Sequence, residues 1–162
     1  MSRTVIAIMA GLLCTLAGCK YAASLRRNAS RLRRWVQLLT HLSLLLQEGL
    51  PIPQALCAAA QEHQPPDELL RKMAASMQAN PLSTPATAYQ HTCDESVEKP
   101  TLVRLFAQLG QGTRESRCLA LEQAAGELRL MAESAAARAE KDVKLWQTLG
   151  FIGGTCLTIL LL

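Results

Sequence analysis

The chain has 162 residues, 49% of them hydrophobic and 4% aromatic, and its formal net charge is +4. Scarce aromatic side chains among abundant Leu and Ala argue against a β-sandwich and favour helices that pack through small side chains. The 6 cysteines form no Cys-x-x-Cys pair, so neither a zinc site, a redox motif nor a disulfide framework is expected.

Two uncharged apolar segments stand near the ends of the chain, at residues 4–18 and 145–162. A bilayer core of ~30 Å requires ~20 mostly apolar helical residues. The second segment approaches this length, and the first reaches it if Lys20 extends its side chain toward the headgroups. The expected organisation is an N-terminal transmembrane helix over residues 1–23, a polar domain over 24–144 and a C-terminal transmembrane helix over 145–162.

Basic residues follow the first apolar segment, and no acidic residue occurs before Glu48. They are Lys20, Arg26, Arg27, Arg31, Arg33 and Arg34. Because positively charged flanks stay in the cytoplasm, the polar domain is expected to be cytoplasmic, with both chain ends on the other side. Each charge near the bilayer adds about 1 kcal/mol of attraction to anionic headgroups. No aromatic platform or nucleic-acid-binding motif accompanies the basic run, so a lipid membrane is the expected partner and nucleic acid is not.

An alternative topology rests on residues 16–19, Leu-Ala-Gly-Cys, which match the lipobox of a bacterial lipoprotein after an apolar stretch. In this alternative Cys19 is lipidated, the polar domain lies outside the cell and residues 145–162 form a C-terminal tether. The uncompensated basic residues that would have to be exported argue against it.

The first predicted helix of the polar domain carries an apolar seam with alternating spacings of three and four residues. The seam consists of Leu32, Trp35, Leu39, Leu42 and Leu46. Gly49 is expected to end this helix, and the prolines at 51 and 53 prevent its immediate continuation.

Shorter helices are predicted over the middle of the chain. One covers residues 53–62, and a second starts at Pro66 or Asp67 and stops near residue 80. Residues 86–92 form a helix of one or two turns behind an N-cap at Thr84.

The acidic stretch with Asp94, Glu95 and Glu98 is expected to be a solvated loop. Pro100 then begins a helix that Gly110-Gln111-Gly112 closes. The buried side of this helix is expected to contain Leu102, Leu105, Phe106 and Leu109.

From Thr113 onward the sequence contains neither a proline nor another strong helix breaker. A second seam follows the same spacing: Cys118, Leu121, Ala125, Leu128, Ala132, Ala135 and Ala139. We therefore predict one unbroken helix from about Arg114 through Trp146 into the last apolar segment, paired with the leucine seam of residues 32–46. The expected fold class is all-α.

Residues that could carry chemistry are not grouped in any known pattern. His41, His63 and His91 form no His-x-x-x-His pair, and no glycine-rich loop is followed by Lys-Ser or Lys-Thr. No serine or cysteine is marked out as a nucleophile. We therefore expect no enzymatic activity, and predict no catalytic residue, cofactor or metal.

Three parts of the sequence, taken in order, resemble the stage III sporulation protein AB family of endospore-forming bacteria. They are the run EGLPIPQAL at 48–56 behind a basic helix, the Leu109-Gly110 pair, and the run LWQTLGFIGG at 145–154. The resemblance covers nearly the whole chain, including both apolar segments.

The resemblance implies a cytoplasmic helical bundle similar to the type II secretion system F domain, between two transmembrane helices. It also implies a platform or adaptor subunit in the mother-cell membrane of a sporulating bacterium. Such a subunit would belong to the channel complex joining mother cell and forespore, and would dock a secretion-type ATPase and other membrane subunits. Association of several copies of the chain into a homo-oligomer is a further alternative.

The residues that we predict to contact a partner lie at two turns expected to face away from the membrane. At the first turn they are Glu48, Gly49, Pro51 and Pro53, and at the second Leu109, Gly110 and Gly112. The same glycines and prolines can equally serve only to make the turns.

Overall fold

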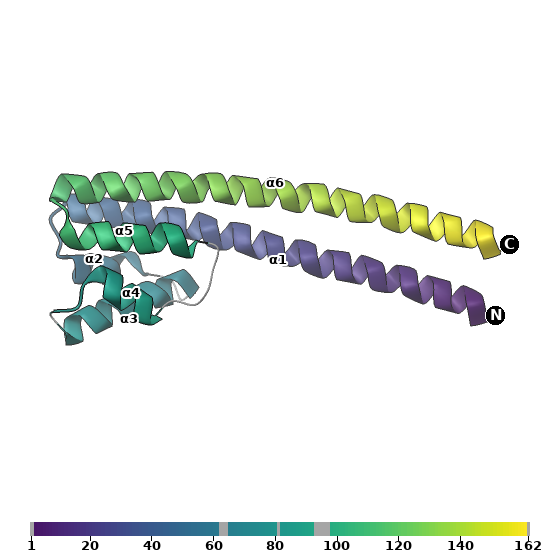
Figure 1. Ribbon diagram of the computed structural model, residues 1–162, viewed down its shortest axis with the longest axis horizontal. Helices are drawn as coiled ribbons and strands as arrows, with labels where there is room; N and C mark the ends of the chain where they lie inside the picture. Colours follow the sequence, from purple (N-terminus) through teal and green to yellow (C-terminus); the bar gives the residue numbers. More distant parts are fainter. Residues whose placement is uncertain (1, 62–64, 81, 93–97, 162) are drawn as a thin grey trace. The chain divides into compact units, whose positions relative to one another are not determined.

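The computed structural model describes residues 2–61, 65–80, 82–92 and 98–161, with side chains at these positions except 2–19, 22, 65, 147, 150, 151 and 153–161. Among the described residues the only regular secondary structure is α-helix, which confirms the all-α prediction (Figure 1). The helices are α1 (Ser2–Gln47), α2 (Ile52–Ala59), α3 (Pro65–Ala79), α4 (Pro85–Thr92), α5 (Lys99–Gln111) and α6 (Arg114–Leu161).

The chain divides into two compact units. Unit 1 contains Met1–Ser30 and Ala132–Leu162, and unit 2 contains Arg31–Met131. The helices α1 and α6 therefore contribute to both units, whereas the four shorter helices belong to unit 2 alone. The unbroken last helix predicted from about Arg114 is present as α6.

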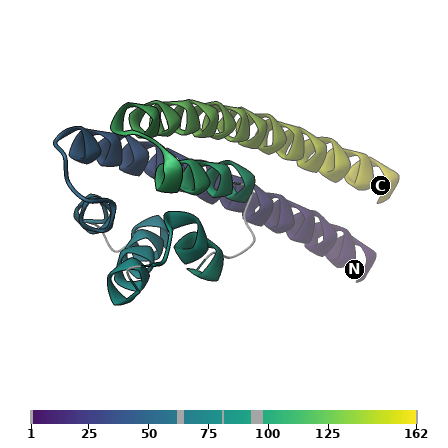
Figure 2. The same ribbon diagram turned by 60° about the vertical axis from the view of Figure 1, so that its left-hand side comes forward.

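The core of unit 2 is built on the leucine seam of α1, whose predicted members are all buried. Within this unit α1 and α6 lie side by side, as the pairing of the two seams predicted (Figure 2). The Sγ atom of Cys118 on α6 lies 4.0 Å from the carbonyl oxygen of Ser43 on α1. Leu121 and Leu128 are fully buried, while Cys118 and Ala125 are half-buried at the edge of the seam.

The end of α1 shows why Gly49 is needed there. Its φ of +93° lies in the left-handed region that L-residues other than glycine rarely adopt. The N–H of Gly49 donates to the carbonyl of Leu46 at 3.1 Å, and the N–H of Leu50 donates to that of Leu45 at 3.2 Å. These two bonds form a Schellman cap, which satisfies the last carbonyls of the helix.

Helix α2 is shorter than predicted, because it ends at Ala59. The side chain of Arg71 on α3 takes over the carbonyls that follow. Its Nε donates to the oxygen of Ala60 at 2.9 Å and its second guanidinium nitrogen to that of Gln61 at 3.3 Å. A long-range side chain thus replaces the helical hydrogen bonds that would have continued α2.

Helix α4 begins as predicted from Thr84-Pro85. The hydroxyl of Thr84 accepts a hydrogen bond from the N–H of Thr87 at 3.3 Å, which caps the first turn. Tyr89 on this helix packs on Phe106 of α5 with ring centroids 4.9 Å apart. Both rings are buried, so they join α4 to α5.

Helix α5 confirms the predicted buried side, because all four apolar residues named for it are buried. The predicted end of α5, Gly110-Gln111-Gly112, is wrong for Gly110. Gly110 lies inside the helix, and Gly112 alone is the cap, with its N–H donating to the carbonyl of Gln108 at 3.1 Å. A Cβ atom at Gly110 would lie 3.5 Å from Cδ of Pro85, an ordinary van der Waals contact, so Gly110 lies against the start of α4 with room for a methyl group.

The prediction of a solvated acidic loop was wrong for Glu98. This residue is 4% exposed, and its carboxylate pairs with Nε of Arg31 at 2.7 Å. A buried carboxylate requires such a partner, since desolvation otherwise disfavours its charged form. Asp94 and Glu95 lie outside the described residues.

Two further ion pairs join the helices of unit 2. Arg34 on α1 binds Asp67 on α3 through two hydrogen bonds. Arg104 on α5 pairs with Glu127 on α6, whose carboxylate also accepts a hydrogen bond from the hydroxyl of Thr101 at 3.3 Å.

In unit 1, residues 2–30 of α1 and residues 132–161 of α6 run antiparallel, and both chain ends lie at the same end of the unit (Figure 1). Ala29, Ala132 and Ala139 are buried, which fits the close approach expected of an alanine seam. On the surface, Nζ of Lys144 donates to the carboxylate of Glu140 at 2.9 Å. This hydrogen bond, together with the charge of Lys144, lowers the pKa of Glu140.

Among the residues described, none of the helices has the length and apolarity needed to cross a membrane. Most of the two segments predicted to do so, at 1–23 and 145–162, lie outside the residues with described side chains.

Candidate docking surface

Two turns lie at one end of unit 2. The turn between α1 and α2 and the turn between α5 and α6 are adjacent there (Figures 1 and 2). The first turn is formed by residues 48–51 and the second by Gly112 and Thr113. We refer to these two turns and the groove beside them as the docking end. Its groove is lined by Gln47, Arg114, Glu115, Cys118, Leu119 and Glu122.

The structure places the residues predicted for partner contact in different environments. Glu48, Gly49, Pro51 and Gly110 are exposed, and Pro53 and Gly112 are half-buried. Leu109 is fully buried, so its side chain packs in the core of unit 2 next to the second turn. Contact with a partner stays a prediction for all seven residues.

The groove lies between the last turn of α1 and the first turns of α6 and has a volume of about 470 Å³. Leu119 forms an apolar part of its wall and is 58% exposed. Leu44, which lies about one helical turn before Gln47 on α1, is 52% exposed. Large apolar side chains at this exposure provide surface that a partner can cover.

The charge of the docking end is mostly negative. Glu48, Glu115 and Glu122 contribute carboxylates, and Arg114 contributes a single cation. The carboxylate of Glu115, in the first turn of α6, also interacts favourably with the positive end of the helix dipole. The combination of an apolar wall with an acidic rim suits a partner element that carries an apolar residue beside Lys or Arg.

Unit 2 has a second hollow besides the groove at its docking end. Its volume is about 250 Å³, and it is lined by Arg34, Gln37, Leu38, His41, Ala59 and Gln61. Its only charged group from the lining, Arg34, already binds the buried Asp67. Within the described ranges, no group of three or more His, Cys, Asp or Glu side chains could hold a metal ion.

The groove residues of α6 were not predicted from the sequence, because the predicted contacts were confined to residues 48–53 and 109–112. One signal was present. Leu119 is an apolar residue that falls outside the seam containing Cys118 and Leu121, so it had to face away from the partner helix. Gln47 carried no such signal, because its place in the groove depends on which residues of α6 lie opposite.

The chain was compared with protein-family models, curated proteins and solved structures. No curated protein and no solved structure matches the chain. The family model described as stage III sporulation protein AB matches residues 3–162, which include every helix and both turns of the docking end. The chain belongs to the stage III sporulation protein AB family, as the resemblance of its sequence predicted.

Proposed function

We propose that the chain is a non-enzymatic platform subunit of the channel complex between mother cell and forespore. In this proposal it is held in the mother-cell membrane by both ends and docks a secretion-type ATPase through its docking end. The family match gives it a role in sporulation. The same match gives no support to the alternative of a lipoprotein modified at Cys19.

Membrane anchoring is supported by the sequence of the two ends and by their placement. Residues 4–18 and 145–162 are apolar and uncharged, and helices α1 and α6 bring both ends of the chain to the same end of unit 1. Two helices that enter one membrane side by side require this arrangement. The basic residues after the first segment favour a cytoplasmic unit 2.

Thiol labelling of Cys57 tests this topology. Cys57 is exposed on α2, whereas Cys118 is half-buried, so a variant that keeps Cys57 and carries Ala at the other cysteines gives a single accessible probe. A membrane-impermeant maleimide should label it in inside-out vesicles and leave it unlabelled on intact cells. A denatured sample checks that the thiol reacts. Labelling on intact cells would reverse the topology and favour the lipoprotein alternative.

Docking at the turns is supported most strongly by the position of the predicted residues. The turn between α1 and α2, which contains Glu48, and the turn between α5 and α6, which contains Gly112, are far apart in the sequence but lie at the same end of unit 2 (Figure 1). The groove there is lined by Gln47, Arg114 and the exposed Leu119. Reversal of the Glu48 charge by Glu48→Lys should therefore weaken binding of the candidate ATPase about tenfold, equivalent to about 1.4 kcal/mol. Surface plasmon resonance with the full chain in mild detergent measures this change.

Glu68→Lys is the matched control, because Glu68 is also exposed but lies on α3. It should change the dissociation constant less than about twofold, since solvent screens charges that lie outside an interface. Absence of binding by the wild-type chain would refute the adaptor function. Equal weakening by the two variants would show that the ATPase does not dock at this end.

A further inference from the structure

Exposed aromatic and apolar side chains gather in unit 1 where the predicted membrane segments begin. Tyr21 on α1 is 53% exposed and Trp146 on α6 is 38% exposed. Leu145 and Leu149, on the same stretch of α6, are both more than half exposed. Tyr and Trp are enriched at membrane–water interfaces, where their rings meet the acyl chains and their polar atoms meet headgroups.

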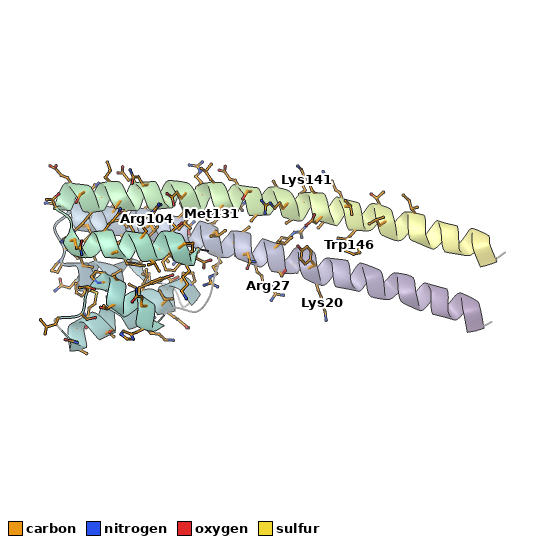
Figure 3. The ribbon with its side chains drawn as sticks, viewed as in Figure 1. Lys20, Arg27, Arg104, Met131, Lys141 and Trp146 are labelled. Atoms are coloured by element: carbon orange, nitrogen blue, oxygen red, sulfur yellow. The ribbon has the colours of Figure 1, made fainter. Side chains whose placement is uncertain are left out.

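Basic side chains surround the same stretch of the two helices. Figure 3 shows Lys20 and Arg27 extending from α1 on one side of the helix pair, and Lys141 extending from α6 on the opposite side. All three are exposed, and within the described part of the chain none of them forms an ion pair. Lys144, in contrast, is already paired with Glu140.

We propose that Lys20, Arg27 and Lys141 form a collar that selects anionic lipid headgroups, with Tyr21 and Trp146 placed in the headgroup layer. This inference rests on the proposed anchoring of the chain in a membrane. The cations lie on both outer sides of the helix pair, so they can contact several lipids around it. A contact between one basic side chain and one anionic headgroup favours that lipid over a neutral one about fivefold.

Depth-dependent quenching tests the position of Trp146. The chain has 2 tryptophans, and the Trp35→Phe variant leaves Trp146 as the single reporter. The full chain is reconstituted into phosphatidylcholine vesicles that carry bromine at shallow or deep acyl positions. Shallow bromines should quench Trp146 at least twice as strongly as deep ones. Stronger quenching by deep bromines would place Trp146 in the bilayer core and overturn the collar. Absence of quenching at every depth would instead refute the membrane anchoring of the proposed function.

Lipid selectivity is tested with mixed vesicles in which either phosphatidylglycerol or phosphatidylcholine is brominated. Quenching of Trp146 by the anionic lipid should exceed quenching by the neutral lipid several-fold, up to about fivefold. The excess should disappear in 1 M salt, where the Debye length falls to about 3 Å.

A triple variant identifies the groups responsible. Lys20→Gln, Arg27→Gln and Lys141→Gln together should bring the two lipids to equal quenching while insertion continues. The control variant carries Arg33→Gln, Lys72→Gln and Lys99→Gln, three positions of unit 2 outside the docking end. The control should retain the wild-type excess. Equal quenching in the wild-type chain, or the same loss in both variants, would overturn the collar.

Discussion

Replacement of Arg34 by Met is expected to lower the free energy of unfolding by about 3–5 kcal/mol, because it leaves a buried carboxylate without its guanidinium partner. Asp67 is 0% exposed. Its Oδ2 accepts a hydrogen bond from Nε of Arg34 at 3.1 Å, and its Oδ1 accepts one from the second guanidinium nitrogen at 2.7 Å. The apolar part of the methionine side chain retains much of the packing, so the loss reports mainly on the charge.

Urea denaturation of the full chain in mild detergent, followed by far-UV circular dichroism, measures this loss. Arg33→Met is the matched control, because Arg33 is the exposed neighbour on the same helix, and it should change the free energy by less than about 0.5 kcal/mol. The double variant Arg34→Met, Asp67→Asn should be less destabilised than Arg34→Met alone, since the buried charge is removed together with its guanidinium partner. A loss for Arg34→Met no larger than that of the control would show that the ion pair contributes little.

Replacement of Trp35 by Ala is expected to destabilise unit 2 by about 3–5 kcal/mol, the cost of removing a large side chain from a packed core. Trp35 is 1% exposed in the middle of the leucine seam. Among the described residues its indole N–H has no hydrogen-bond partner. Trp35→Phe keeps most of the ring volume and removes this buried donor, so we expect it to cost less than about 1.5 kcal/mol.

The same denaturation experiment compares the two Trp35 variants, monitored by circular dichroism because fluorescence would lose one of its reporters. A large loss with Phe, similar to that with Ala, would mean that the indole N–H makes a contact essential to the fold. A small loss with Ala would mean that the neighbouring helices close over the missing side chain.

The helices of this fold were predictable because their signals are local. The spacing of Leu32, Trp35 and Leu39 reports the face of one helix, and Gly49 and Pro51 report the turn that follows it. The pairing of the two long helices also followed, since each carries a seam that only another helix can bury.

The remaining features depend on residues that are distant in the sequence. Glu98 was misplaced in a solvated loop because its partner, Arg31, belongs to α1 and leaves no trace near residue 98. The early end of α2 depends in the same way on Arg71. At the docking end, the turns could be predicted from glycine and proline, but the groove could not. Its walls come from two helices whose relative register no local pattern encodes.

The ion pairs of α1 have a consequence for the order of events during synthesis. Arg31 and Arg34 emerge from the ribosome before the carboxylates that bind them, Glu98 and Asp67. At ~5–20 residues per second, Asp67 follows Arg34 by roughly several seconds. Under the proposed topology, neither arginine has its carboxylate partner yet when the first helix inserts into the membrane and its orientation is set. Both become counter-ions of buried carboxylates afterwards. The same guanidinium groups would then act first as a signal for membrane topology and later in the ion pairs that join α1 to the rest of unit 2.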